Sequence, residues 1–255
     1  MTFRAAGKLL WFLFEVGVIL VDYVLTAAFV SGTHRRVARA AWLHRACRRH
    51  IKIYSCTVTH QGPVPQSGLL VANHLSYLDI LVLSSITPTV FVSKSEVRNW
   101  PLFGWLASLG GTVFIQRERR THVGPVNREI AAAMADGALV AVFPEGTSTN
   151  GDVVLPFRSP LWEPVMAGAH SIATAYLHYE LEGGDARHEV CYWGDHTFFP
   201  HAVNLLGKRR VRAHVTFGTF ERTTDDRKEL ALQLRAAVLG LAPAGRVAQD
   251  MANQA

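Results

Sequence analysis

Residues Val71–Asp79 read VANHLSYLD, and this stretch joins the end of an apolar strand to the start of a helix. Asn73 and His74 stand at the corner, and Asp79 follows His74 by five residues, within the first turns of the expected helix. Open α/β sheets bind ligands at such corners, beyond the carboxyl ends of their strands. A carboxylate from the helix can hold one ring nitrogen of the corner histidine and leave the other nitrogen free to act as a base.

Two more polar clusters follow apolar strands. Residues 143–149 read FPEGTST after an apolar run, and residues 111–117 read GTVFIQR, which ends a third strand at Arg117. Because parallel strands end at the same edge of a sheet, we expect the three clusters to converge on one site.

The rest of the chain from residue 53 alternates strand-like apolar runs with helical patterns. The expected strands are Ile53–Val58, Gly68–Ala72, Thr89–Val92, Thr112–Ile115, Ala138–Phe143, Ile172–Leu177, Glu189–Trp193 and Val211–Phe217. The expected helices are Tyr77–Ser85, Leu102–Leu109, Val123–Met134, Leu161–Ala169, Pro200–Leu206 and Asp225–Leu239. This alternation predicts an α/β fold with a mostly parallel mixed sheet covered by helices on both faces.

The charge of the chain is concentrated at its beginning. The 255 residues carry a net charge of +6, with 49% hydrophobic and 18% charged residues, a composition that excludes global disorder. Residues 1–52 hold nine Lys or Arg residues against two acidic ones, a balance of +7, so the other 203 residues carry a balance of −1. Nucleic-acid binding is not expected, because the basic residues are interleaved with an apolar stretch of membrane length and the α/β body is slightly acidic.

That apolar stretch is Leu9–Val30, 22 residues that as a helix would be roughly 33 Å long, against a hydrocarbon core of about 30 Å. Lys8, Glu15 and Asp22 are seven residues apart and share one helical stripe, which is costly in lipid unless it meets protein, water or head groups. The next segment has an apolar stripe and an opposite basic face, as in helices that lie on anionic lipid. Its apolar positions are Val37, Ala40, His44, Cys47 and Ile51, and its basic positions are Arg35, Arg39, Arg45 and Arg49.

Two membrane arrangements fit this pattern. One is a two-helix anchor on one leaflet, and the other is a single transmembrane helix with a basic juxtamembrane stop; a soluble core helix is a third reading. We predict an anchor over residues 1–52, a catalytic domain over 53–242 and a flexible tail over 243–255. The basic residues place the catalytic domain on the cytoplasmic side of the inner membrane. Three cysteines with no CxxC spacing exclude a disulfide framework and disfavour a structural zinc site.

The three polar clusters resemble the conserved blocks of the glycerolipid acyltransferases of the lysophosphatidate acyltransferase type. The N-H-x4-D block is matched by Asn73, His74 and Asp79; the G-x-x-F-I-x-R block by Gly111, Phe114, Ile115 and Arg117; and the F-P-E-G-T block by Phe143, Pro144, Glu145, Gly146 and Thr147. A V-x-K-x-E segment is also present, as Val92, Lys94 and Glu96. The resemblance runs from about residue 50 to 180. It departs at Ser148, where the family usually has Arg, and in the fourth block, where IATAYL has no Pro.

The resemblance implies a general-base mechanism. His74 would remove the proton from an acceptor hydroxyl as it attacks an acyl thioester, and Asp79 would orient the imidazole and support its positive charge. No covalent enzyme intermediate is needed, and the chain has no GxSxG motif. Arg117 is the expected anion anchor. The other residues expected at the substrate are Asn73, Glu145, Gly146 and Thr147, with Lys94 and Ser148 as further candidates; no metal or cofactor is expected.

Each of these assignments has a structural alternative. Arg117 begins the run RERR, which could be a solvated loop. Glu145 could cap the turn that follows it, and Lys94 could form a surface pair with Glu96. The segment WGDHTFFPH (193–201) could mimic a metal site through His196 and His201 with Asp195, but its aromatic residues suit a lipid-facing loop or core packing better.

The expected function is therefore acyl transfer from acyl-carrier protein or coenzyme A to a lysolipid, with 1-acylglycerol 3-phosphate, which gives phosphatidate, as the leading acceptor. Ser148 keeps open an acceptor without phosphate, and residues 193–201 resemble a string found in relatives that acylate lyso-ornithine lipids. A non-catalytic lipid-binding protein on the same scaffold is the alternative from another class. The expected partners are the lysolipid, the acyl thioester and an anionic membrane surface.

Overall fold

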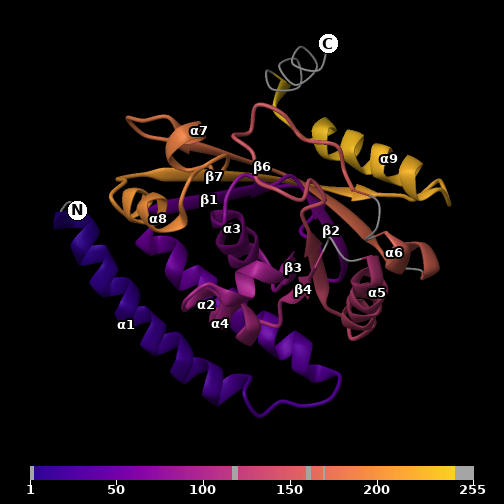
Figure 1. Ribbon diagram of the computed structural model, residues 1–255, viewed down its shortest axis with the longest axis horizontal. Helices are drawn as coiled ribbons and strands as arrows, with labels where there is room; N and C mark the ends of the chain where they lie inside the picture. The colour runs from indigo at the N-terminus through magenta and orange to yellow at the C-terminus, as the bar shows by residue number, and fades with distance from the viewer. Residues whose placement is uncertain (1–2, 117–119, 159–161, 169, 245–255) are drawn as a thin grey trace.

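The computed structural model describes residues 3–116, 120–158, 162–168 and 170–244. Its centre is a seven-stranded sheet in the order β1-β7-β6-β2-β5-β3-β4 (Figure 1). The strands are β1 (Cys56–Gln61), β2 (Gly68–Ala72), β3 (Val90–Lys94), β4 (Val113–Ile115), β5 (Leu139–Val142), β6 (Ile172–Leu181) and β7 (Val211–Phe220). All neighbours pair in parallel except β6 and β7, so β1 and β7 run opposite to the other five. The mostly parallel mixed sheet is confirmed.

Helices cover both faces of this sheet, as predicted. They are α1 (Phe3–Thr26), α2 (His34–Ile53), α3 (Leu78–Ile86), the 3-10 helix η1 (Ser95–Asn99), α4 (Phe103–Leu109), α5 (Arg120–Ala135), α6 (Glu163–Ala167), α7 (Ala186–Glu189), α8 (Phe198–Leu206) and α9 (Arg227–Gly240). Residues of α1, α2, α3 and α8 pack in one apolar cluster on one face, and residues of α5, α6 and α9 pack in a second cluster on the other. The central strands β2 and β5 are buried along their whole length, which is why they read as continuous apolar runs.

One predicted strand is wrong. Residues 189–193 form the end of α7 and the turn after it, and not a strand. The backbone N–H of Cys191 donates to the carbonyl of Ala186, and that of Tyr192 donates to the carbonyl of Leu75, so neither is available to a sheet ladder. Val190 and Cys191 are apolar because they are buried in the core. A buried turn and a buried strand both need apolar residues, so the apolar run alone did not distinguish them.

Helices α1 and α2 pack against each other and against the α/β body. The stripe of three charges on α1 faces protein: Arg49 holds Glu15 by two hydrogen bonds of 2.5 and 3.0 Å, and Arg45 donates to Asp22 at 3.0 Å. At the start of α1, Lys8 donates to the hydroxyl of Ser55 at 2.8 Å and to the carbonyl of Lys208 at 3.0 Å. Arg45 and Arg49, which were expected to face lipid head groups, hold the two carboxylates of α1 while 42% and 48% of their side chains remain exposed.

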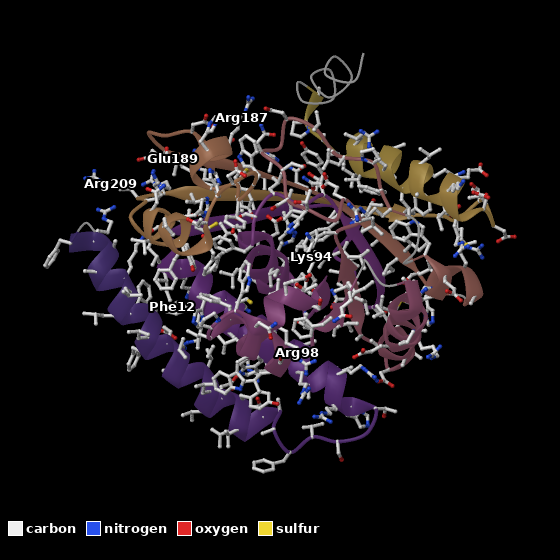
Figure 2. All side chains as sticks on the ribbon, viewed as in Figure 1. Phe12, Lys94, Arg98, Arg187, Glu189 and Arg209 are labelled. Carbon is white, nitrogen blue, oxygen red and sulfur yellow. The ribbon has the colours of Figure 1, made fainter. Side chains whose placement is uncertain are left out.

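The same helices share the core of the body. Phe12 points from α1 toward the body, where its ring lies 5.9 Å from that of Phe103 and 5.3 Å from that of His50 (Figure 2). Ile51 and Ile53 at the end of α2 belong to the same apolar cluster as the strands. The predicted anchor over residues 1–52 is thus continuous in packing with the region from residue 53. Of the predicted flexible tail, residues 245–255 lie outside the described residues.

The outer face of α1 is apolar and exposed. Among the described helices, α1 alone is long and apolar enough to cross a membrane, and 22% of its most apolar window is buried. Its exposed apolar side chains are Phe3, Leu10, Trp11, Leu13, Phe14, Val21, Val24 and Leu25. A helix with one face on protein and a wide apolar face outside has the surface of a membrane-associated helix.

Candidate active site

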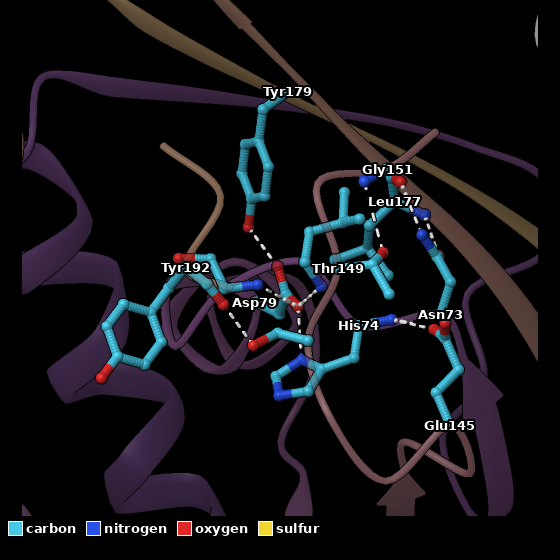
Figure 3. A network of polar contacts seen from close by, with 12 residues as sticks. Asn73, His74, Asp79, Glu145, Thr149, Gly151, Leu177, Tyr179 and Tyr192 are labelled. Carbon is cyan, nitrogen blue, oxygen red and sulfur yellow. Dashed lines mark hydrogen bonds and ion pairs between the residues drawn. The ribbon is translucent and has the colours of Figure 1, made fainter. Parts of the chain in front are cut away.

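The predicted convergence of polar corners follows from the strand order. Strand β2 lies between β6 and β5, and all three run in the same direction, so the segments that leave their carboxyl ends are neighbours. The residues after β2 thereby meet Glu145, which follows β5, and Leu177 and Tyr179 of β6 (Figure 3).

Asn73 fixes the corner to the neighbouring strand. Its side-chain N–H donates to the carbonyl of Leu177 at 3.0 Å, and its side-chain oxygen accepts from the N–H of Leu177 at 2.7 Å. The residue is 2% exposed. These contacts suit a residue that positions His74; the predicted contact of Asn73 with substrate stays a prediction.

His74 and Asp79 form a hydrogen-bonded pair. The atoms His74 Nδ1 and Asp79 Oδ2 lie 2.7 Å apart. Because the same oxygen also accepts the backbone N–H groups of Leu75 (2.7 Å) and Ser76 (3.0 Å), it acts as an acceptor, and Nδ1 therefore carries the proton. The other nitrogen, Nε2, has the lone pair that a general base needs. The His74 side chain is 21% exposed and Asp79 is fully buried, so a substrate can reach only the histidine.

Two aromatic residues complete the surroundings of this pair. The ring of His74 stacks on that of Phe143, with centroids 4.2 Å apart and an interplanar angle of 16°. The hydroxyl of Tyr179 donates to Asp79 Oδ1 at 2.6 Å, and burial together with the nearby Asp79 raises the pKa of Tyr179 well above its usual range. All hydrogen bonds to Asp79 are thus donated, which keeps it an acceptor and fixes the histidine tautomer.

Tyr179 was missed from the sequence. The predicted strand stopped at Leu177, whereas β6 continues to Leu181. Extending the two-residue alternation past Leu177 would have placed Tyr179 on the same face, toward the site.

Glu145 lies at the site with both carboxylate oxygens bound by backbone. Oε1 accepts the N–H of His74 at 2.7 Å, and Oε2 accepts the N–H of Leu155 at 2.8 Å. The residue is 3% exposed, and burial raises its pKa to about 8, although the two N–H donors act in the opposite direction. Glu145 therefore ties the third block to the backbone of the catalytic corner. Its predicted role at the acceptor head group stays a prediction.

The residues after Glu145 form the rim of the site. Gly146 has a φ of 80°, a left-handed conformation that favours glycine, and Thr147 next to it is exposed. The hydroxyl of Ser148 donates to the carbonyl of Tyr192, and the N–H of Thr149 donates to the carbonyl of His74 at 3.0 Å. This loop is held on both sides, and Thr147 is its freest side chain for a substrate contact.

Two predicted residues are not placed at the pair. Lys94 ends β3 with an exposed side chain. Arg117 lies outside the described residues.

The histidine considered as a metal ligand and the cysteines lie in packed surroundings. Nδ1 of His201 lies 3.0 Å from the hydroxyl of Tyr77, and its Nε2 lies 3.1 Å from the carbonyl of Cys191. Cys47 and Cys56 are buried, and burial raises the pKa of each thiol to about 12, which leaves them without thiolate character at neutral pH.

An apolar cavity of about 150 Å³ lies beside the site, between the body and the two N-terminal helices. Phe12 and Ile19 of α1 and Trp42 of α2 form one side of it, and Tyr77 and Leu81 form part of the other.

Comparison with known proteins agrees with this geometry. The family model described as Acyltransferase matches residues 55–177. The lyso-ornithine lipid O-acyltransferase of Pseudomonas aeruginosa is 33% identical over 217 residues, which cover 84% of this chain and 81% of that protein. A relative of the same name from Rhizobium meliloti is 35% identical over 162 residues, 59% of this chain and 56% of the relative, so the match spans little more than half of that protein.

Other relatives are named for a different substrate. The 1-acyl-sn-glycerol-3-phosphate acyltransferase of Neisseria gonorrhoeae is 37% identical over 120 residues, 47% of each chain. Among solved structures, the 1-acyl-sn-glycerophosphate acyltransferase of Thermotoga maritima superposes with a TM-score of 0.58 at 18% identity and covers 89% of this chain and 88% of its own. At that identity the match shows a shared fold.

Proposed function

The chain belongs to the acyltransferase family of enzymes that act on lysolipids, and from that premise we propose that it esterifies the free hydroxyl of a lyso-ornithine lipid, with an acyl thioester as donor. The observation that carries the reaction type is the His74–Asp79 pair, with Nδ1 of the histidine held at 2.7 Å and Nε2 left as the base. Three observations favour this acceptor. They are the length of the match to the Pseudomonas relative, Ser148 in place of the usual Arg, and the resemblance of residues 193–201 to a string found in relatives that acylate lyso-ornithine lipids.

In the proposed reaction, Nε2 of His74 takes the proton of the acceptor hydroxyl as its oxygen attacks the thioester carbonyl. The imidazolium forms beside the buried carboxylate of Asp79, which stabilises its charge. When the carbon–sulfur bond breaks, the imidazolium returns the proton to the leaving thiolate. The products are an ester and a free thiol, of acyl-carrier protein or coenzyme A, and no cofactor takes part.

Ser148 is the position at which the acceptor head group can be tested. A serine carries no positive charge that could bind a phosphate. In addition, the hydroxyl of Ser148 already donates a hydrogen bond to the carbonyl of Tyr192. A second candidate acceptor is 1-acylglycerol 3-phosphate, favoured by the name of the Neisseria relative and by the complete first and second blocks. For that acceptor, Arg117 would be the main anion anchor.

We expect the purified chain to have a kcat/KM at least about tenfold higher for lyso-ornithine lipid than for 1-acylglycerol 3-phosphate, because a hydrogen bond to a charged group is worth about 1.5–3 kcal/mol and one such donor is missing. Ser148→Arg should shift this ratio toward the phosphate acceptor by roughly tenfold, and Ser148→Ala, the matched control, should not. Both acceptors are assayed side by side with the same labelled acyl thioester. A wild-type preference for the phosphate acceptor would refute the proposed head group without touching the reaction type.

We also propose that α1 and α2 hold the enzyme on one leaflet of the inner membrane, from the cytoplasmic side. Helix α1 contacts the body near its beginning through Lys8 and contacts α2 farther along through Glu15 and Asp22, which leaves its apolar face outward along its length. The acyl chain of the acceptor or of the donor would enter the cavity beside Tyr77 directly from the membrane. Arg35, Arg48 and Lys52 are exposed and would face anionic head groups.

Cysteine labelling tests this arrangement. The three natural cysteines are buried, so an introduced cysteine carries the signal. Phe3→Cys, at a residue that is 98% exposed, should be labelled by a membrane-impermeant maleimide from the same side as Arg209→Cys on the α/β body (Figure 2). Labelling of residue 3 from the opposite side would mean that α1 spans the bilayer.

A further inference from the structure

Three side chains on the antiparallel pair β6–β7 bring metal-ligating atoms together. His178 lies directly opposite His214 in the register of the two strands, and their rings stack with centroids 4.6 Å apart at 16°. Glu180, two residues after His178, faces the same side of the sheet. The nitrogen and oxygen atoms of the three side chains that can bind a metal all lie within 4.8 Å of one another.

One ring nitrogen of His214 has a partner on the next strand. Its Nδ1 lies 2.8 Å from the hydroxyl oxygen of Thr59 on β1, and that hydroxyl can donate to the carbonyl of Ala213 at 3.5 Å. In this arrangement Nδ1–H donates to Thr59, and Nε2 carries a lone pair. Nε2 is buried, has no hydrogen-bond partner among the described residues and lies 3.6 Å from Glu180 Oε1.

A lone pair and a carboxylate oxygen that face each other at this distance call for a cation between them. We propose that His178, Glu180 and His214 bind a divalent transition-metal ion of the zinc class. Zinc–nitrogen and zinc–oxygen bonds of about 2.0–2.2 Å place tetrahedral ligands about 3.3–3.5 Å apart. The 3.6 Å separation of His214 Nε2 and Glu180 Oε1 is close to that value, so small side-chain rotations bring the third ligand into range. Water takes the fourth position.

This site is separate from the catalytic pair. Side chains alternate along β6, and Tyr179 points toward Asp79, so its neighbours His178 and Glu180 point to the opposite face of the sheet. Arg212 lies opposite Glu180 and donates to its Oε2 at 3.3 Å, which leaves Oε1 for the metal. The nearby positive charge and the exposure of Glu180 predict binding in the micromolar range, weaker than in a buried structural zinc site.

Calorimetric titration of the full chain in detergent with Zn²⁺ tests the site, and Co²⁺ absorption reports the coordination geometry. We expect one equivalent to bind with a micromolar Kd, and the affinity to fall at least tenfold in His178→Ala and in His214→Ala. His188→Ala is the matched control, since His188 also pairs with a carboxylate, that of Asp185, but is more exposed and has no second histidine; it should leave the Kd unchanged.

A thermal-shift measurement guards against variants that fold poorly. Zn²⁺ should raise the Tm of the wild-type chain and of His188→Ala but not that of His214→Gln, which keeps a polar side chain of similar reach. Absence of Zn²⁺ binding to the wild-type chain would overturn the proposal. Binding that is unaffected by substitution of either histidine would overturn it as well.

Discussion

His74→Ala is expected to lower kcat for acyl transfer by about 10³-fold, with little change in the KM for either substrate. The imidazole is the only side chain of the described pair that a substrate can reach, since Asp79 is fully buried. General-base catalysis by a positioned side chain contributes about 10²–10⁴-fold, and the fixed Nδ1–H tautomer predicts an effect well inside that range. The measurement is steady-state transfer from a labelled acyl thioester to a lysolipid by the purified variant.

The fold should survive this substitution. The corner is held by backbone, because the N–H of His74 donates to Glu145 and its carbonyl accepts from Thr149. The side chain adds a stacking contact with Phe143, worth about 0.5–1.5 kcal/mol. His60→Ala, in an exposed position of β1, is the matched control and should retain full activity. A His74→Ala protein that is folded and still active would exclude the general-base role.

Asp79→Asn is expected to lower kcat by about 10²-fold, less than the loss at His74. Oδ2 accepts three hydrogen bonds from nitrogen, so the amide oxygen of Asn takes that position and its NH₂ group faces the hydroxyl of Tyr179. The histidine tautomer is then preserved, and only the negative charge beside the imidazolium is lost. Hydrogen bonds to charged groups are worth about 1.5–3 kcal/mol, at 1.36 kcal/mol for each factor of ten in rate.

Two further variants separate charge from geometry. Tyr179→Phe keeps the charge of Asp79 and removes one donor, so it should cost less than Asp79→Asn in kcat and leave KM unchanged. Asp79→Ala leaves the N–H groups of Leu75 and Ser76 without their acceptor in the core, so it should lower the Tm, whereas Asp79→Asn should not. If Asp79→Asn retained wild-type kcat, the carboxylate would have no electrostatic role in the reaction.

The sequence carried enough information for the sheet and the meeting of its corners. Residues such as His74 and Glu145 follow buried parallel strands, and the geometry of a parallel sheet brings strand ends together whatever the intervening sequence. The resemblance to glycerolipid acyltransferases is confirmed by the matched family model and by the relatives.

The missing parts depend on contacts that are long-range in sequence. Tyr179 reaches Asp79 across 100 positions, and His178 meets His214 only because β7 turns back antiparallel to β6. The backbone contacts of Glu145 were not predictable either: its two carboxylate oxygens accept the N–H groups of His74 and Leu155, and the sequence of the loop indicates neither contact. Sequence spacing reports which residues share an edge, but it does not report which way a side chain turns there.

The central claim is that the chain forms an ester on a lysolipid hydroxyl through His74. The most direct measurement is mass spectrometry of lipids from cells that express the wild-type chain or His74→Ala and are fed each lysolipid in turn. The account predicts a doubly acylated lipid, sensitive to mild alkali, that accumulates with the wild-type chain, most strongly from lyso-ornithine lipid, and is absent with His74→Ala at equal protein levels. Equal accumulation of that lipid with both chains would contradict it.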